Sequence, residues 1–205
     1  MRGRSDSPNN NTNMLTPLEK AAIFKRRPLP IETDGSLKLS SEQVVRERCY
    51  LAGFTEHSLY MQKALVEARC ALDEDEVPIG AVIIHKGKII AKAHNQVERL
   101  KDPTAHAEIL AITQGAAALQ SKWLKDCTLY VTVEPCVMCA GAIILSRIDR
   151  IVFGVSDLKT GAFGSKINLN TLGLNHRVKV KKGVLEEESS QLLKNFFMAK
   201  RNKSK

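Results

Sequence analysis

Two short segments of this 205-residue chain carry side chains that could bind a metal ion and move protons. They are His106-Ala107-Glu108 and Pro135-Cys136-Val137-Met138-Cys139. Two thiolates and one imidazole form a ligand set that suits zinc, which prefers four ligands in a tetrahedron. Because His106, Cys136 and Cys139 fill only three positions, the fourth is left for water or substrate, as in catalytic sites. The spacing predicts a catalytic Zn2+ site with one ion per chain.

Glu108 is the residue predicted to move protons at this site. On a regular helix it would point about 200° away from His106, which argues against a role as a ligand. Near the start of a helix it can still reach a water on the metal, whose pKa zinc lowers to about 7. We expect Glu108 to take a proton from this water, pass it to a ring nitrogen, and protonate the leaving amino group.

Each motif by itself has a plainer interpretation. A single Cys-x-x-Cys can be redox-active or half of a structural zinc ribbon, and His-x-Glu occurs often by chance. Together, with Pro135 before the first cysteine and a strand between the motifs, they match the signature of zinc-dependent nucleobase deaminases. The combination is far more specific than either half.

Both motifs are predicted to lie where helices begin. Cys136 and Cys139 are three residues apart in a first helical turn, so both sulfurs share one face. Free amides and the positive dipole end there favour the thiolate forms. A second helix, from Ala105 to about Leu119, places His106 at its start. Because both helices follow strands, the motifs can meet at strand ends, where open α/β sheets bind ligands.

The rest of the pattern predicts the fold that positions these motifs. From Thr55 onward the order is α-β-β-α-β-α-β-β-α, with a Lys86-Gly87 hairpin signal between the first two strands. The predicted strands are 80–85, 88–94, 127–132, 150–155 and 178–181, and the first and last helices are 55–72 and 188–199. We expect a three-layer α/β/α fold with a mixed central sheet of about five strands.

Composition limits the compartment and the partners. The 31 Lys and Arg exceed the 22 Asp and Glu, which gives a formal net charge of +9 and favours nucleic acid as a partner. No apolar run reaches the ~20 residues of a membrane span. Five cysteines without a secretory start indicate a reducing, cytoplasmic location.

Residues 1–54 are interpreted as a partly disordered extension, followed by a zinc deaminase domain at 55–205 with a basic C-terminal helix and tail.

From about Thr55 to Arg201 the chain resembles the bacterial tRNA-specific adenosine deaminases, which have the cytidine deaminase-like fold. The matching blocks are Glu76–Val82, Asp102–Ile109, Leu129–Ala142, Phe153–Ala162, Asn175–Arg177 and Phe196–Phe197. The resemblance implies a hydrolase that acts on a cyclic amidine C–N bond, converting adenosine to inosine at the wobble position of tRNA. It matches His106, Cys136 and Cys139 to the metal ligands and Glu108 to the proton shuttle. It does not cover residues 1–54.

The resemblance also implies contacts with the anticodon loop of tRNA. It matches Asn95 to a residue that holds the flipped nucleotide and Asp157 to one that contacts the RNA backbone. Lys159 is expected to donate a hydrogen bond to a phosphate of the RNA, and the ring of Phe197 is expected to stack on a base. A homodimer is implied, in which the neighbouring subunit completes each active site. Asn95 and Asp157 are also ordinary turn residues, however, and paired phenylalanines on a helix are more often core.

Two other functions would use the same site. A deaminase of a free base or nucleoside, such as guanine or cytosine, needs the same four residues, although the net charge and the Asp157 loop favour RNA. A non-catalytic, zinc-stabilised partner subunit would have no need of Glu108, which this chain keeps. Turnover of an anticodon stem-loop compared with that of free nucleosides separates these possibilities.

Overall fold

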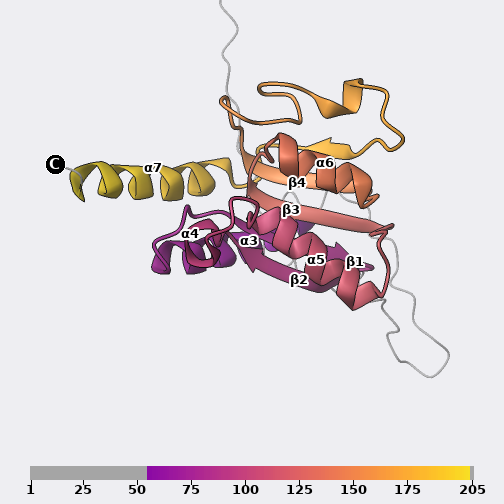
Figure 1. Cartoon of the computed structure of the whole chain (residues 1–205), viewed down its shortest axis with the longest axis horizontal. Helices are drawn as coiled ribbons and strands as arrows, with labels where there is room; N and C mark the ends of the chain where they lie inside the picture. The colour runs from indigo at the N-terminus through magenta and orange to yellow at the C-terminus, as the bar shows by residue number, and fades with distance from the viewer. Residues whose placement is uncertain (1–54, 204–205) are drawn as a thin grey trace, which may run out of the picture. The chain divides into compact units, whose positions relative to one another are not determined.

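The computed structural model describes residues 55–203, so the extension predicted at 1–54 and residues 204–205 lie outside the described residues. A five-stranded sheet in the order β2-β1-β3-β4-β5 forms the centre of the described chain (Figure 1). Its strands are β1 (Gly80–His85), β2 (Lys88–His94), β3 (Cys127–Val133), β4 (Arg150–Val155) and β5 (Lys179–Lys181). β1 pairs antiparallel with β2 and β3, whereas β3, β4 and β5 run parallel. The predicted mixed sheet is confirmed.

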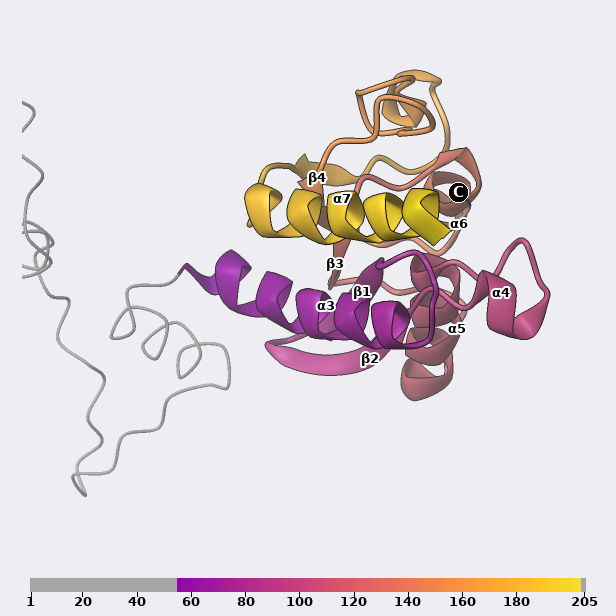
Figure 2. The same cartoon turned by 90° about the vertical axis from the view of Figure 1, so that its left-hand side faces the viewer.

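Helices cover both faces of this sheet, which confirms the predicted three layers. α3 (Glu56–Asp73) and α7 (Glu186–Lys203) lie on one face, and α5 (Ala107–Leu119) and α6 (Val137–Leu145) lie on the other (Figure 2). Neighbouring residues of β1 enter different cores, because side chains alternate along a strand. Val82 packs in the core beneath α3, and Ile83 packs in the core beneath α5 and α6.

Two glycines lie at positions where the backbone conformation or the packing of the layers favours a residue without a side chain. Lys86 and Gly87 both have positive φ, at 48° and 73°, as the tight turn between β1 and β2 requires. Gly80 begins β1 directly under α3, where an added Cβ would lie 2.1 Å from the carbonyl oxygen of Ala64. A glycine is therefore needed there for α3 to pack closely on the sheet.

Several element boundaries differ from those predicted. A short helix α4 (Val97–Leu100) and a 3-10 turn η1 (Leu169–Thr171) were not predicted, since so few residues show no usable periodicity. α7 is longer at both ends than the predicted 188–199. Its first turn holds Glu186, Glu187 and Glu188, which suit the positive end of a helix dipole. Within residues 55–203, no helix combines the length and the apolar character needed to cross a membrane.

Candidate active site

The predicted metal ligands lie at the starts of α5 and α6. His106 is the N-cap residue of α5 and Cys136 is the N-cap residue of α6, both with extended backbones, so each helix begins one residue beyond its ligand. Cys139 follows in the first turn of α6. The N–H of Gln96, just after β2, donates to the carbonyl of Ala105 at 3.0 Å and holds the His106 segment against the end of the sheet.

The three ligand atoms converge on one point. Nδ1 of His106 lies 3.8 Å from Sγ of Cys136 and 3.5 Å from Sγ of Cys139. All three ligand atoms lie within 4.8 Å of one another. A tetrahedral zinc ion with ordinary bond lengths would separate a nitrogen and a sulfur ligand by about 3.6 Å. The spacing of these side chains therefore fits one shared metal ion.

The charge state of the two thiols also suits a cation. A hydrogen bond from Cys139, supported by one from His106, lowers the pKa of Cys136 to about 4. The same hydrogen bond and burial raise the pKa of Cys139. The hydrogen bond to Cys136 raises the pKa of His106. Because metal ligands bind deprotonated, a divalent cation would displace any proton left on these sulfurs.

Glu108 lies in the first turn of α5, beside these ligands. Its side chain is 3% exposed, and among the described residues its Oε2 is buried without a hydrogen-bond partner. Burial raises the pKa of Glu108 to about 7. A carboxyl group with a pKa near neutrality can both accept and donate a proton. An unpaired buried oxygen also indicates a place where a ligand binds.

Asn95 is buried and held by a second glutamate. Its Nδ2 donates to Oε2 of Glu76 at 3.0 Å, and Oε1 of Glu76 accepts the backbone N–H of Arg99 at 2.8 Å. This hydrogen bond fixes the orientation of the amide, in which Oδ1 is the acceptor atom of Asn95. Sequence reasoning did not assign Glu76 a role, although it lies in a block that matches the tRNA-specific deaminases. Its partner Asn95 is 19 positions away along the chain.

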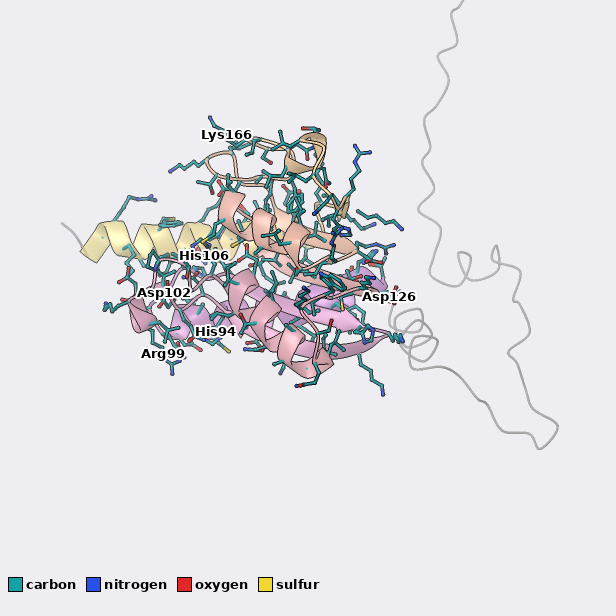
Figure 3. All side chains as sticks on the ribbon, turned by 45° about the vertical axis from the view of Figure 1, so that its right-hand side comes forward. His94, Arg99, Asp102, His106, Asp126 and Lys166 are labelled. Atoms are coloured by element: carbon teal, nitrogen blue, oxygen red, sulfur yellow. The ribbon has the colours of Figure 1, made fainter. Side chains whose placement is uncertain are left out.

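Asp157 and Lys159 lie in the loop after β4. Oδ1 of Asp157 accepts the backbone N–H groups of Lys159 at 2.8 Å and Thr160 at 3.2 Å, so this carboxylate caps the turn. The turn presents the side chain of Lys159 to solvent. Figure 3 shows His106 between α4, which carries Arg99, and the loop that carries Lys166.

The two phenylalanines of α7 have different environments. Phe196 is buried, whereas Phe197 is 45% exposed and meets it edge-on at 5.3 Å between ring centroids. Both line a hollow of about 680 Å³, together with Arg99 and Lys200. None of the observed contacts within residues 55–203 joins Phe197 or Lys159 to the metal-binding residues. The structure therefore brings the three predicted metal ligands together but leaves these two at the periphery.

Known proteins are similar to this chain in sequence. A family model of MafB19-like deaminases matches residues 55–201. The chain is 51% identical over 144 residues to the tRNA-specific adenosine deaminase of Aquifex aeolicus, covering 70% of this chain and 95% of that protein. It is 47% identical over 152 residues to the tRNA-specific adenosine deaminase of Bacillus subtilis, covering 74% and 94%.

A solved structure gives a similar result. It comes from studies of A-to-I editing by tRNA:A34 deaminases at the wobble position of transfer RNA. It shares 43% sequence identity with this chain at a TM-score of 0.61, covering 65% of this chain and 97% of that one. The range matched by the family model includes all five strands and both motif-bearing helices.

Proposed function

Because this chain belongs to the MafB19-like deaminases, alongside the tRNA-specific adenosine deaminases, we propose that it converts adenosine to inosine at the wobble position of tRNA. The reaction replaces the exocyclic amino group of adenine with an oxygen from water and releases ammonia. The observation that carries the deamination is one cluster, in which three metal-ligand atoms lie beside a buried glutamate with an unpaired oxygen. The choice of tRNA as substrate rests on the similarity to tRNA-specific adenosine deaminases.

Zinc is the metal that these donors favour. Nδ1 of His106 and the sulfurs of Cys136 and Cys139 would hold it, since thiolate and imidazole ligands suit zinc better than magnesium or calcium. When bound, the ion would supply a water of lowered pKa at its remaining position. The unpaired Oε2 of Glu108 at the same place is consistent with such a water.

Glu108 would manage the protons of the reaction. Its Oε2 accepts a proton from the attacking water and delivers it to the ring nitrogen beside the reacting carbon. The same carboxyl group then takes the second proton from the newly added hydroxyl group of the substrate and passes it to the leaving amino group, so ammonia departs as a neutral molecule. Burial raises the pKa of Glu108 above its ordinary value, which favours a carboxyl group that can both accept and donate a proton.

Asn95 would hold the nucleotide after it leaves the stack of bases. Its side chain is fixed by Glu76 with the amide oxygen left over, so it offers an acceptor to a hydroxyl or amino donor of the substrate. A wobble base already lies in a loop, where unstacking costs less than in a duplex. Asn95 therefore acts on binding, whereas Glu108 acts on the chemical step.

The contacts with the rest of the anticodon loop would come from peripheral side chains. Lys159 is exposed on the loop after β4 and can neutralise a phosphate. The exposed ring of Phe197 can stack on a base, an interaction worth about 1–3 kcal/mol. The net charge of +9 supports a polyanionic substrate over a free base.

A homodimer is also proposed. Val137 and Leu145 expose apolar side chains on the helix that carries both cysteines, with Leu145 73% exposed. Between them, an added Cβ at Gly141 would meet nothing within 4 Å, so this face is open to close approach. Exposed apolar surface of this kind marks a protein interface. Leu145→Glu should shift the molar mass measured by light scattering from dimer to monomer.

We assign the deaminase domain to residues 55–205, preceded by an extension at 1–54, and place the protein in the cytoplasm. The family match begins at residue 55, which supports the boundary. A tRNA substrate and the free thiols needed at the metal site fit a reducing compartment. A chain that starts at residue 55 should edit an anticodon stem-loop at the rate of the full chain.

The decisive experiment uses purified protein and three substrates. Total tRNA is incubated with the protein and sequenced, and inosine is read as guanosine at the wobble position. Free adenosine and free guanine are assayed in parallel for ammonia release. The proposal expects wobble inosine and little turnover of either small molecule. Rapid turnover of free guanine with unedited tRNA would overturn it.

A further inference from the structure

A third buried glutamate joins the metal-binding segment to the loop after β4. Glu134 directly precedes Pro135 and Cys136, and its side chain is 2% exposed. Its Oε1 accepts the backbone N–H groups of Phe163 at 2.9 Å and Ser165 at 3.1 Å. Its Oε2 accepts the backbone N–H of Asp157 at 3.2 Å. One carboxyl group thus binds both ends of the loop.

The backbone around Glu134 tightens the same connection. The N–H of Glu134 donates to Val155 at 2.9 Å, and the carbonyl of Pro135 accepts the N–H of Ala162 at 2.9 Å. Gly161 lies against the carboxyl group, where an added Cβ would be 2.6 Å from its carbon atom. The loop can wrap around Glu134 this closely only because residue 161 has no side chain.

These contacts explain how an irregular loop keeps one shape. Backbone N–H groups that are turned away from solvent need an acceptor, and three in this loop find the same one. A buried carboxyl group in turn needs donors, because burial without hydrogen bonds is costly. Glu134 and the loop therefore satisfy each other, two residues from the metal-binding Cys136.

We propose that Glu134 is a positioning residue for substrate binding, which sets the distance between the loop bearing Asp157 and Lys159 and the reacting centre. It touches neither substrate nor metal ligand in this role and acts through the loop. The proposal rests on the proposed function, because that loop is given RNA contacts there. It adds a physical link between the metal-binding segment at the start of α6 and the loop that is proposed to bind the anticodon loop.

Glu134→Gln tests this link in the metal-loaded enzyme. The new amide oxygen can keep the bonds to Phe163 and Ser165, but the amide nitrogen then faces the N–H of Asp157, donor against donor. We expect KM for an anticodon stem-loop to rise about tenfold, because one buried bond is replaced by an opposed pair of donors. Zinc content and kcat should stay within about threefold, since the metal ligands and Glu108 are unchanged.

Glu187→Gln on α7 is the matched control. It makes the same change of net charge at an exposed position, so it separates loop positioning from a weaker repulsion of RNA. KM for the control should match that of the wild type. An equal rise of KM in both variants would overturn the proposal. So would loss of zinc from Glu134→Gln, which would mean that Glu134 serves the metal site itself.

Amide hydrogen exchange gives a readout that does not depend on tRNA. In Glu134→Gln, exchange at Asp157 should quicken at least about tenfold, while Phe163 and Ser165 stay protected. Unchanged exchange at Asp157 would overturn the proposal even if KM rose. If the wild-type protein edited no tRNA, the proposed function would fail, and this measurement would still decide whether Glu134 holds the loop.

Discussion

The floor of the site and its rim are held in place by different means. The floor consists of His106, Glu108, Cys136 and Cys139, and the rim consists of Asn95, Asp157, Lys159 and Phe197. The floor lies at the starts of two helices that pack on the sheet, so its geometry depends on the main core. On the rim, Asn95 and the Asp157 loop are each held by one buried glutamate, Glu76 and Glu134.

This difference predicts that substitutions in the two regions impair the enzyme in different ways. Substitutions in the floor should cause loss of the metal or loss of catalysis, because no other group in the cluster can replace a metal ligand or transfer the proton. Changes in the rim should weaken substrate binding and leave the metal in place. Substitutions that break this division would show that the two regions are one cooperative unit.

The largest effect is expected for Cys136→Ala. Loss of one of three protein ligands should bring zinc well below one per chain and abolish activity, and the melting temperature should fall because the ion ties α5 to α6. Metal analysis and calorimetry measure both. Cys70→Ala on α3 is the control and should keep its zinc. Full zinc in Cys136→Ala would rule out Cys136 as a ligand.

The next effect is expected for Glu108→Gln. This variant keeps the shape of the side chain but cannot exchange protons, so kcat should fall by the ~10²–10⁴-fold typical of general acid–base catalysis. Zinc content and stem-loop affinity should be retained. Activity within tenfold of the wild type would mean that another group moves the proton.

Glu76→Gln tests the Asn95 side of the rim. A glutamine there can accept from Asn95 or from the N–H of Arg99, but it opposes the other donor. Loss of about 1–3 kcal/mol of buried hydrogen bonding should lower kcat/KM by about 5- to 150-fold, with zinc retained. Glu74→Gln, which removes a surface pair with the Arg99 side chain, should have little effect. Equal losses in both variants would contradict a special role for Glu76.

The same division explains what the sequence could predict. The floor was accessible because ligands at the starts of helices have short spacings along the chain, and five strands were marked by apolar alternation or runs. The role of Glu134 was not accessible, because its partners are 23 to 31 positions away in a loop without periodicity. Asp157 caps a turn, as its plainer interpretation predicts, and its contact with the RNA backbone stays a prediction.

The smallest effect is expected at the far end of the rim, on α7. Lys200 pairs with Asp75 at 2.8 Å, and its Nζ lies 5.2 Å from the centroid of the Phe196 ring. An exposed pair of this kind contributes about 0–1 kcal/mol, so Lys200 can exchange Asp75 for a phosphate at small cost. Truncation after Met198 removes Lys200 and Arg201 and should hardly change the melting temperature.

The salt dependence of RNA binding shows whether the C-terminal end of α7 contacts phosphates or is only solvated. If Lys159, Arg177, Lys200 and Arg201 neutralise about four phosphates, log affinity should fall against log salt with a slope of about −3. The truncated chain keeps Lys159 and Arg177, so its slope of log affinity against log salt should flatten to about −1.4. Zinc content and turnover of a short oligonucleotide should be unchanged, because the floor lies on other elements. An unchanged affinity and slope would show that the end of α7 contributes no phosphate contact.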